Sequence, residues 1–488
     1  MIRLEQLSFQ YADSPYGVSN IDLSIRKGEC VVLTGPSGGG KTTLTRLLNG
    51  LAPGYYAGVR TGRILLDGRD LEQLAQHQIG RQVGSVFQDP KSQFFSSELT
   101  GEVAFACENY GLQQQEIRHR TNSAIHTFAL EPLRERELDV LSSGEKQRVA
   151  IAAIYALGPH IYVCDEPTAN LDREGTRQLA QALRRLKAEG HTLVIAEHRL
   201  AWLRGIADRF LYLRDGRLLW AKRPEELEAM SAEERERYGL REAAERQMPA
   251  LPPPEPVAAS IRARGLSCKK NGIYIFRDRS LSASAGLITA ITGMNGAGKT
   301  SLALVLAGLW RESGGSVEIT GKPLGPAARR KLVWYGSNDT GTQFFTDSVT
   351  KELLLNGEQT MPRLEQARAL LKRLGLYSYK DVHPATLSGG QKQRLSIACG
   401  LLSGREILIL DEPTSGLDGG NMRMIAEVLR DTAGNGKTVL VITHDDELIR
   451  DCCDDCWNLN KKNRLFFVKM NIPASVRPDG LRVCFCEW

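Results

Sequence analysis

The sequence has little of what marks membrane-spanning or secreted proteins. Its longest nearly apolar run, Val149 to Cys164, contains Gly158 and Pro159, and it is shorter than the roughly 20 apolar residues that a membrane-spanning helix needs. Ten cysteines in 488 residues are too few for a disulfide scaffold. The first residues include Arg3 and Glu5 rather than the apolar segment of a secretory leader. These absences predict a cytoplasmic chain without a membrane span of its own.

The composition is that of a globular protein with more than one domain. Hydrophobic residues make up 42% and charged residues 25% of the chain, which excludes disordered, collagen-like and coiled-coil proteins. The net charge of +6 is spread along the sequence and is compatible with a nucleotide or an anionic membrane surface without requiring either. Single cores seldom grow beyond about 250 residues, so we expect two domains.

Cysteines are concentrated near the C-terminus, where a metal site has to be considered. The cluster lacks the paired CxxC spacing that is typical of zinc sites. We therefore expect reduced, partly buried thiols. The five residues are Cys452, Cys453, Cys456, Cys484 and Cys486.

The chain contains the same set of motifs twice. A Leu-Ser-x-Gly run, an apolar strand ending in Asp-Glu-Pro-Thr and a second strand ending in His recur at a spacing of 246 residues. A Gly-x4-Gly-Lys-Thr run recurs at a spacing of 258. We interpret this as a duplication in which the second copy has lost about a dozen residues between its Gly-x4-Gly-Lys-Thr run and its Leu-Ser-x-Gly run. The marker pairs are Lys41 and Lys299, Ser142 and Ser388, Asp165 and Asp411, and His198 and His444.

A charged segment followed by prolines separates the copies. Residues Leu251-Pro-Pro-Pro-Glu-Pro256 favour an extended, semi-rigid linker, because consecutive prolines stop helix and sheet. We predict a first domain at 1–222, a linker at 223–260, a second domain at 261–460 and a C-terminal tail of unknown role at 461–488.

Within each copy, short uncharged strands alternate with longer helical patterns. Cys30–Thr34, Ile161–Cys164 and Thr192–Ala196 have the composition of strands covered on both faces, and 174–189 is typical of an amphipathic helix. This alternation predicts an α/β fold with a mainly parallel sheet and crossover helices.

The Gly-x4-Gly-Lys-Thr runs predict phosphate-binding loops (P-loops). Each follows a buried strand and precedes a helix, so backbone N–H groups and the helix N-terminus face a phosphate. We expect Lys41 and Lys299 to reach the β- and γ-phosphates of ATP, and Thr42 and Thr300 to bind Mg²⁺. The nucleotide-binding residues are predicted to be Gly35, Pro36, Ser37, Gly38, Gly39, Gly40, Lys41, Thr42 and Thr43, with Gly293, Met294, Asn295, Gly296, Ala297, Gly298, Lys299, Thr300 and Ser301 in the second copy.

A pair of acidic residues ends one buried strand in each copy. Asp165 and Asp411 are expected to bind Mg²⁺, directly or through water, because an unpaired carboxylate there would be costly. Their neighbours Glu166 and Glu412 suit the polarisation of an attacking water. Acidic residues at strand ends can also simply cap the next helix.

Together these residues resemble the nucleotide-binding domains of ATP-binding cassette (ABC) proteins. The run Leu387-Ser-Gly-Gly-Gln-Lys-Gln-Arg394 is the most specific match, and the resemblance covers both copies. It implies two tandem P-loop domains, each with a mainly parallel sheet, an antiparallel β part and a helical subdomain. It also implies that the Leu-Ser-x-Gly run of one copy closes over the nucleotide held by the other, with its N–H groups facing the γ-phosphate.

The resemblance assigns further roles. It implies that Tyr11 stacks on adenine, that Gln88 contacts Mg²⁺ and the attacking water, and that His198 and His444 sense the γ-phosphate. It likewise makes Asp172 and Asp418 the aspartates of the loop after the acidic pair. In the Leu-Ser-x-Gly runs it implies contacts to nucleotide from Ser142, Ser143, Gly144, Glu145, Ser388, Gly389, Gly390 and Gln391.

The segment Val86–Phe95, followed by Glu102, narrows the resemblance to the cassettes of energy-coupling factor (ECF) transporters, which import vitamins and metal ions. Gln343-Phe-Phe345 and Glu352 repeat the pattern. The resemblance implies that this region receives the coupling helices of a transmembrane subunit, although the phenylalanine pairs fit a core position as well. It implies membrane partners (a transmembrane coupling protein and a substrate-binding membrane protein), peripheral attachment to the cytoplasmic face of the membrane and no nucleic-acid partner.

Departures from the family pattern fall on one of the two composite sites. Site one joins Lys41, Gln88, Asp165, Glu166 and His198 with Ser388–Gln391. Site two joins Lys299, Asp411, Glu412 and His444 with Leu141–Glu145; it has Asn338 in place of Gln88, Lys270 in place of Tyr11, and Ser143 and Glu145 in its Leu-Ser-x-Gly run.

Tyr274 or Phe276 are alternative adenine stacks in site two. Both sites keep the Lys, Asp, Glu and His set, so we expect both to hydrolyse ATP, with site one faster. Two MgATP would draw the copies together, and hydrolysis would release them.

Two other classes of fused cassette remain as alternatives. Paired cassettes that act on ribosomes usually carry a long basic linker, whereas the linker here is acidic before its prolines. Fused sugar-importer cassettes generally have a more altered second Leu-Ser-x-Gly run. A DNA-repair cassette would need inserted zinc knuckles, which the sequence lacks.

Overall fold

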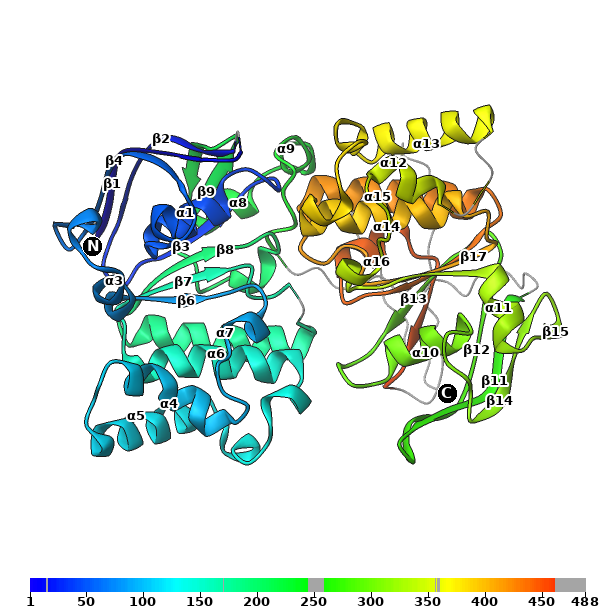
Figure 1. Ribbon diagram of the computed structural model, residues 1–488, viewed down its shortest axis with the longest axis horizontal. Coiled ribbons are helices and arrows are strands. Elements are labelled where there is room, and N and C mark those ends of the chain that lie inside the picture. Colours follow the sequence, from blue (N-terminus) through cyan, green and yellow to red (C-terminus); the bar gives the residue numbers. More distant parts are fainter. Residues whose placement is uncertain (15, 170, 245–258, 356, 358–359, 461–488) are drawn as a thin grey trace.

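The computed structural model describes residues 1–14, 16–169, 171–244, 259–355, 357 and 360–460. The predicted tail at 461–488 and the proline-rich stretch at 251–256 lie outside this part of the chain. Two halves are visible in Figure 1, the first in blue to green and the second in green to red. We call the described residues up to 244 the first half and those from 259 onwards the second half.

The first half contains an antiparallel sheet and a mainly parallel one. The antiparallel sheet has the order β2-β1-β4-β5 and the larger sheet the order β10-β9-β3-β8-β7-β6, in which only the β10–β9 pair is antiparallel. The strands are β1 (Ile2–Tyr11), β2 (Gly17–Ile25), β3 (Cys30–Thr34), β4 (Gly58–Leu66), β5 (Arg69–Asp70), β6 (Val83–Val86), β7 (Ile161–Asp165), β8 (Thr192–Ala196), β9 (Arg209–Arg214) and β10 (Arg217–Lys222).

Helices cover the larger sheet and form a separate helical part. The helices are α1 (Lys41–Leu48), α2 (Leu51–Gly54), α3 (Gln76–Gln82), α4 (Leu99–Asn109), α5 (Gln114–Thr127), α6 (Ser143–Leu157), α7 (Arg173–Ala188), α8 (Pro224–Glu228) and α9 (Ala232–Arg237), with 3₁₀ turns at Leu71–Gln73, Pro90–Gln93, Glu131–Leu133, Leu138–Val140 and Ala201–Leu203. Local sequence explains the limits of α6: Ser142 caps its start, and Gly158, at φ 79°, ends it before Pro159.

The second half repeats this plan. Its antiparallel sheet has the order β12-β11-β14-β15, and its parallel sheet the order β16-β17-β18-β13-β19. The strands are β11 (Ala259–Lys270), β12 (Ile273–Ser284), β13 (Ile288–Thr292), β14 (Gly314–Ile319), β15 (Lys322–Pro323), β16 (Val333–Gly336), β17 (Ile407–Asp411), β18 (Thr438–Ile442) and β19 (Asp455–Asn458). The helices are α10 (Lys299–Leu306), α11 (Pro326–Leu332), α12 (Val349–Leu354), α13 (Met361–Arg373), α14 (Gly389–Leu402), α15 (Gly419–Gly434) and α16 (Asp446–Cys452), with 3₁₀ turns at Thr340–Thr342, Tyr377–Tyr379 and Pro384–Thr386.

The expected α/β class, with a parallel sheet, an antiparallel part and a helical part in each copy, is confirmed. The predicted buried strands are buried along almost their whole length, and the amphipathic helix expected at 174–189 is α7. The described cysteines are all free and buried, and no group of metal-ligating side chains occurs among the described residues.

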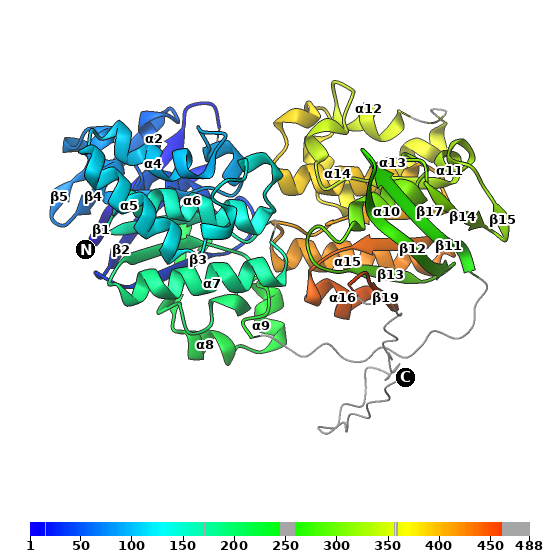
Figure 2. The same cartoon turned by 90° about the horizontal axis from the view of Figure 1, so that it is seen from below.

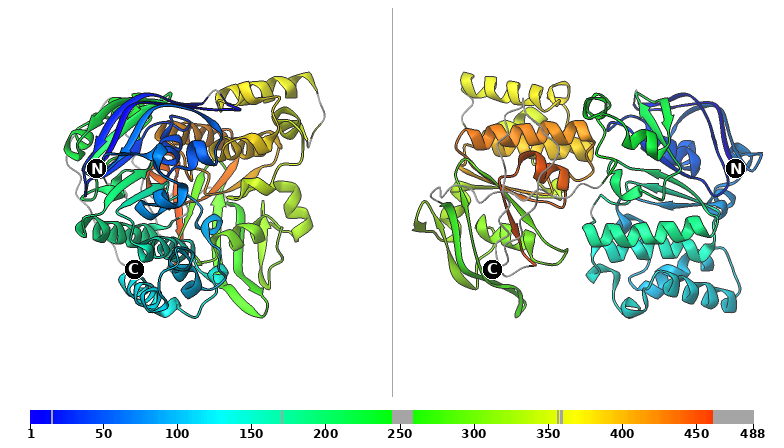
Figure 3. Two further views of the ribbon diagram at one scale, coloured as in Figure 1. Left: turned by 60° about the vertical axis from the view of Figure 1, so that its left-hand side comes forward. Right: turned by 180° about the vertical axis from the view of Figure 1, so that it is seen from behind.

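The two halves lie side by side in opposite orientations. In Figure 1 the helices α4 to α7 lie at the lower end of the first half, whereas α12 to α15 lie at the upper end of the second. The rear view in Figure 3 shows the same arrangement, with the helical parts at opposite ends. Such an arrangement brings the P-loop end of each half towards the other half.

The segment after β10 belongs to the packing of both halves. Leu227, Met230 and Leu240 join the core of the first half, and the residues that follow contact the second half. The predicted linker region at 223–260 therefore starts with packed residues, and the exact domain limits remain a prediction.

Each half has its own apolar core, so we expect the halves to unfold separately. Ile195 in β8 and Ile442 in β18 are both fully buried in different cores. Replacement by alanine removes apolar contacts and leaves a cavity, at a cost of about 2–5 kcal/mol. Differential scanning calorimetry should show two transitions, of which Ile195→Ala lowers one and Ile442→Ala the other. A single transition that both substitutions lower equally would contradict this independence.

Candidate functional site

Both P-loops connect a buried strand to a helix, as predicted. Residues 35–40 lie between β3 and α1, and residues 293–298 lie between β13 and α10. Gly35 has φ 137°, and a Cβ there would lie 2.0 Å from the carbonyl oxygen of Leu213, so only glycine fits. Thr43 and Ser301 lie in the first turn of the two helices.

The P-loop lysines fold back over their own loops. Lys41 Nζ donates to the carbonyl oxygens of Gly35 at 3.1 Å and Pro36 at 2.9 Å. Lys299 Nζ makes the equivalent bonds to Gly293 at 2.7 Å and to Met294. Burial lowers the pKa of both lysines, although nearby carboxylates oppose this shift. Each buried ammonium group is thus held in the loop in which a phosphate is expected.

The strand-end aspartates meet the threonines that follow the lysines. Thr42 Oγ1 donates to Asp165 Oδ1 at 3.2 Å, and Thr300 Oγ1 donates to Asp411 Oδ2 at 2.7 Å. Burial raises the pKa of Asp165 to about 6, with a smaller contribution from Glu166. A buried carboxylate next to a hydroxyl offers only oxygen atoms as metal ligands, and Mg²⁺ prefers oxygen ligands. The residues present therefore match the predicted metal site.

In the first half, the predicted water-activating glutamate is held on two sides. Glu166 Oε1 lies 3.2 Å from His198 Nε2, and Oε2 accepts from Gln88 Nε2 at 3.1 Å. Its backbone has φ 45°, a conformation that is uncommon for a residue with a side chain and that clusters at functional sites. Burial raises the pKa of Glu166, but His198 and Lys41 outweigh it, and the net shift is downward. The carboxylate is thus ionised at neutral pH.

The second half has the same residues but a looser contact. Glu412 Oε1 and His444 Nε2 are 3.7 Å apart, and His444 Nε2 has no hydrogen-bond partner among the residues that the structure describes. Burial raises the pKa of Glu412 to about 7 and lowers the pKa of His444 to about 4. The pKa values of the two glutamates are therefore shifted in opposite directions, and the glutamate–histidine contact is shorter in the first half.

The loops after the acidic pairs end in aspartates that cap the next helices. Asp172 Oδ1 accepts from the N–H of Gly175, and Asp418 Oδ1 from that of Asn421, each at 2.8 Å. A carboxylate at this position satisfies free N–H groups and favours the positive end of the helix. One oxygen of each aspartate is thus fixed within its own half.

The second oxygen of each aspartate contacts the P-loop of the opposite half. Asp418 Oδ2 accepts from the N–H of Ser37 at 2.8 Å, and Asp172 Oδ2 accepts from that of Asn295 at 2.7 Å. Ser37 and Asn295 occupy the same position in their loops. The two halves therefore face each other through a reciprocal pair of contacts.

Further contacts bring the second half to site one. A Cβ on Gly416 would lie 3.3 Å from both Gln88 Nε2 and Glu166 Oε2. The hydroxyls of Tyr16 and Tyr379 are 2.9 Å apart, joining the loop after Tyr11 to the helical part of the second half. The predicted first composite site thus has both halves along its rim.

The Leu-Ser-x-Gly runs form the N-termini of α6 and α14, each closed by a capping box. The Ser142 and Ser388 side chains accept from the N–H groups of Glu145 and Gln391, whose side chains accept in turn from the serine N–H groups. Glu145 is thus occupied in a cap, as Gln391 is. A Cβ on Gly389 would meet nothing within 4 Å, so Ser143, its counterpart, costs no space.

The predicted adenine contacts differ between the halves. Tyr11 is half-buried, and its ring packs edge-on against Phe9 with centroids 4.9 Å apart. Lys270 ends β11 as Tyr11 ends β1, with Nζ 5.1 Å from the Trp310 ring centroid. Of the two alternative adenine stacks in site two, Phe276 is 6% exposed in the core and Tyr274 is 42% exposed, so Tyr274 is the more accessible one. Asn338 lies two residues after the end of β16, as Gln88 lies two residues after the end of β6.

Sequence reasoning missed Tyr335, whose hydroxyl donates to Asp411 Oδ2 at 3.1 Å. The first half has Ser85 at this position of the strand next to the acidic pair. The only indication in the sequence is a large polar tyrosine in this strand of the second half, where the first half has a small serine. Tyr335 gives Asp411 one more donor than Asp165 has, which further separates the two sites.

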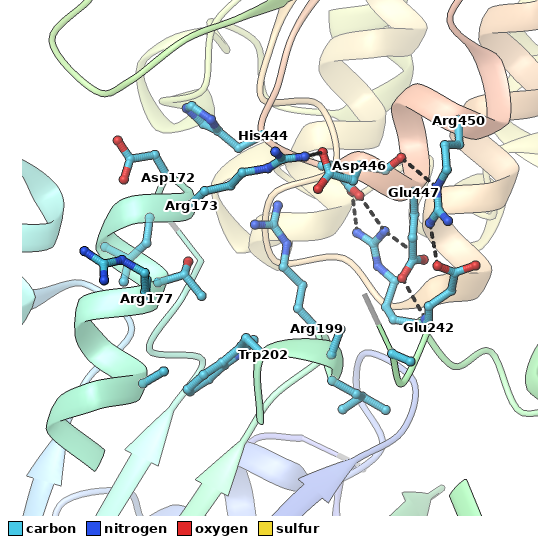
Figure 4. A pocket seen from close by; sticks show the side chains of 18 of the residues that line it. Asp172, Arg173, Arg177, Arg199, Trp202, Glu242, His444, Asp446, Glu447 and Arg450 are labelled. Atoms are coloured by element: carbon cyan, nitrogen blue, oxygen red, sulfur yellow. Dashed lines mark hydrogen bonds and ion pairs between the residues drawn. The ribbon is translucent and has the colours of Figure 1, made fainter. Parts of the chain in front are cut away.

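A cavity of about 870 Å³ lies between the halves, next to His444 of the second half. Figure 4 shows His444, Asp446 and Glu447 on one side of it and Arg177 and Trp202 on the other. Its other lining residues include Asp172, Arg173, Arg199, Arg241, Glu242 and Arg450. Several of these side chains contact residues of the opposite half.

The comparisons with known proteins agree on the class of protein that this chain resembles. A family model described as ABC transporter matches residues 18–169 and 276–415. A candidate ABC transporter ATP-binding protein of Treponema denticola is 38% identical over 468 residues, covering 93% of this chain and 94% of that protein. A candidate HMP/thiamine import ATP-binding protein of Bacillus subtilis, YkoD, is 32% identical, covering 96% and 91%.

Among solved structures, a ribosome-bound archaeal Pelota and ABCE1 assembly contains a similar chain. The TM-score is 0.66 at 24% identity, covering 93% of this chain and 76% of that one. At this identity the similarity concerns the fold alone.

The asymmetry between the two glutamates predicts unequal variants. Glu166→Gln should lower ATP turnover by about 100-fold, because it removes the ionised, doubly held base, whereas Glu412→Gln should leave most of the turnover. Steady-state phosphate release at saturating MgATP measures both. Unchanged turnover in Glu166→Gln together with loss in Glu412→Gln would reverse the assignment.

Proposed function

The chain belongs to the ABC transporter family of ATPases, and from that premise we propose that it is the energy-coupling subunit of a membrane importer of the ECF type, which takes up a vitamin or a metal ion. As a member of this family it binds ATP with Mg²⁺ and hydrolyses ATP through its two cassettes. The importer class, the partners and the residue roles below are parts of the proposal.

The proposed ATP sites assign one task to each group of residues. The P-loop N–H groups and Lys41 or Lys299 bind the phosphates, while the capped N-terminus of α14 or α6 approaches the same γ-phosphate from the other half. When bound, Mg²⁺ neutralises charge on the β- and γ-phosphate oxygens; Thr42, Asp165 and Gln88 would hold it in site one, and Thr300 and Asp411 in site two.

In site one, Glu166 orients and polarises the attacking water, and His198 holds Glu166 while contacting the γ-phosphate. Glu412 and His444 have the same roles in site two. Because each triphosphate draws on N–H groups of both halves, ATP favours the closed pair and its hydrolysis releases it.

The observation that carries the importer proposal is an exposed phenylalanine at the same place in both halves. Phe95 is 75% exposed and Phe345 is 80% exposed, whereas their neighbours Phe94 and Phe344 pack against the cores. The sequence left core and docking positions open for these pairs, and the structure has one residue of each pair packed against a core and the other exposed. Large exposed apolar side chains that are repeated in this way favour a protein interface.

A buried carboxylate fixes the shape of each loop. Glu102 is 3% exposed and accepts from the N–H groups of Phe95 and Ser96 at 2.8 and 2.9 Å. Glu352 accepts from the N–H groups of Phe345 and Thr346, each at 2.9 Å. Such preorganisation lowers the entropic cost of binding a partner. The two loops thus have the features of prepared docking sites.

The placement of the loops supports one common partner surface. They precede α4 and α12, and Figure 2 shows both helices towards the same side of the molecule, opposite α8 and α16. A membrane component that spans both halves would contact both phenylalanines. The described part of the chain contains no helix long and apolar enough to cross a membrane.

The similar proteins favour a function in membrane transport over a function on ribosomes. Full-length similarity at 38% and 32% identity connects this chain to proteins named for ABC transport and for HMP/thiamine import. We therefore propose a transmembrane coupling protein and a small substrate-binding membrane protein as partners. We place the chain at the cytoplasmic face of the membrane and propose no nucleic-acid partner.

Affinity purification of the tagged chain from detergent-solubilised membranes of its source tests the proposal. Integral membrane proteins should co-purify with the wild-type chain. Phe95→Asp/Phe345→Asp should reduce this recovery by more than about tenfold, because interface aromatics carry much of the binding energy, while ATP hydrolysis persists.

Leu219→Asp provides the matched control, since Leu219 is 51% exposed on β10 and outside both loops. It should recover the membrane proteins like the wild type. Recovery of ribosomal subunits in place of membrane proteins, or equal recovery by the double variant, would contradict the proposal.

A further inference from the structure

Arg241 lies in the segment after the last helix of the first half, but its side chain is buried in the second half. It is 2% exposed. Its guanidinium donates to both carboxylate oxygens of Asp445, at 3.1 and 2.7 Å, to Glu447 at 3.4 Å, and to the carbonyl oxygen of Leu417 at 3.3 Å. A buried charge requires such compensation, so the position of each partner is tied to that of Arg241.

The partners of Arg241 belong to loops of different ATP sites. Asp445 directly follows His444, the predicted γ-phosphate-sensing histidine of site two. We call the loop at His444–Asp445 the switch loop of site two. Leu417 directly precedes Asp418, whose carboxylate contacts the P-loop residue Ser37 in site one. One guanidinium therefore joins the switch loop of site two to the loop that reaches into site one.

Neighbouring contacts hold Arg241 against these loops. The N–H of Gly419 donates to the carbonyl oxygen of Gly239 at 2.9 Å, and Arg423 donates to that of Leu240 at 3.2 Å. A Cβ on Gly419 would lie 2.3 Å from the Leu240 oxygen, so only glycine permits this approach. Figure 4 shows Glu242, next to Arg241, joined to Arg450.

The corresponding loop of the first half has a different arrangement of charged residues. There Thr168, the counterpart of Thr414, donates to Glu197 at 2.5 Å, and Arg199 occupies the position that corresponds to Asp445. In the second half Thr414 donates to Asp445 at 2.7 Å instead. The switch loop of the second half thus contains a buried carboxylate whose bidentate guanidinium partner comes from the first half.

We propose that Arg241 is a positioning residue that couples the two ATP sites, by holding the loops at Leu417–Asp418 and His444–Asp445 in one arrangement. This inference rests on the two composite sites of the proposed function but not on any membrane partner. Movement of either loop during hydrolysis is transmitted through the guanidinium to the other. The segment after the first half thereby takes part in the ATPase cycle.

The test measures turnover when only one site is active. Arg241→Met is introduced into the Glu412→Gln chain, which reports on site one, and into the Glu166→Gln chain, which reports on site two. We expect turnover to fall by about tenfold in both backgrounds, as a coupling of about 1.4 kcal/mol implies. We also expect the Hill coefficient for ATP in the otherwise unaltered chain to fall to that of independent sites.

Arg177→Met is the matched control. Arg177 lines the same cavity but pairs with Glu174 on its own helix, so turnover should stay at the level of each parent chain. Arg241→Lys should restore only part of the turnover, because an ammonium group cannot reproduce the bidentate contact.

Arg241→Met/Asp445→Asn/Glu447→Gln separates positioning from stability, since it removes the guanidinium charge together with both carboxylate charges that pair with it. We expect this variant to regain the wild-type melting temperature but not the wild-type turnover. Recovery of both, or a loss in only one background, would overturn the coupling role. Lys41→Ala/Lys299→Ala should abolish hydrolysis; if it does not, the proposed ATP sites fail rather than Arg241.

Discussion

Two aspartates connect the halves of this protein, because each forms hydrogen bonds within its own half and with the P-loop of the other half. Asp172 and Asp418 use one oxygen to cap the helix that follows them and the other to accept an N–H from the P-loop across the interface. A capping carboxylate has little freedom, so the opposite P-loop is positioned with respect to a rigid helix start. The pair is reciprocal, so each P-loop has a fixed position relative to the start of a helix in the other half.

The two halves contain similar sites that differ in their contacts. Glu166 is ionised and held by a histidine and a glutamine, whereas Glu412 is further from its histidine and has a raised pKa. Tyr335 donates a hydrogen bond to Asp411, the aspartate that ends the buried strand in the second half. The reliance of Asp445 on Arg241 adds a connection that runs from the first half to the second only. A fused chain can keep such one-sided features, because the two cassettes always meet in the same order.

Much of this architecture could be predicted from local patterns. The P-loops, the strand-end aspartates and the serine caps are short runs whose backbone context is encoded within about ten residues, and the structure has all of them in the expected elements. Other contacts were beyond reach, because they join segments far apart in the sequence without any periodic signal. Arg241 with Asp445 is one case, and Tyr335 with Asp411 is another. The choice between Phe94 and Phe95 as the exposed residue likewise depended on a buried glutamate that turns the loop.

The proposed mechanism depends most on the sharing of each nucleotide between the halves, and a structure of the Glu166→Gln/Glu412→Gln chain with ATP and Mg²⁺ tests this sharing directly. One triphosphate should contact both Lys41 and Ser388, and the other should contact both Lys299 and Ser142. Two nucleotides that each contact residues of one half alone would contradict it.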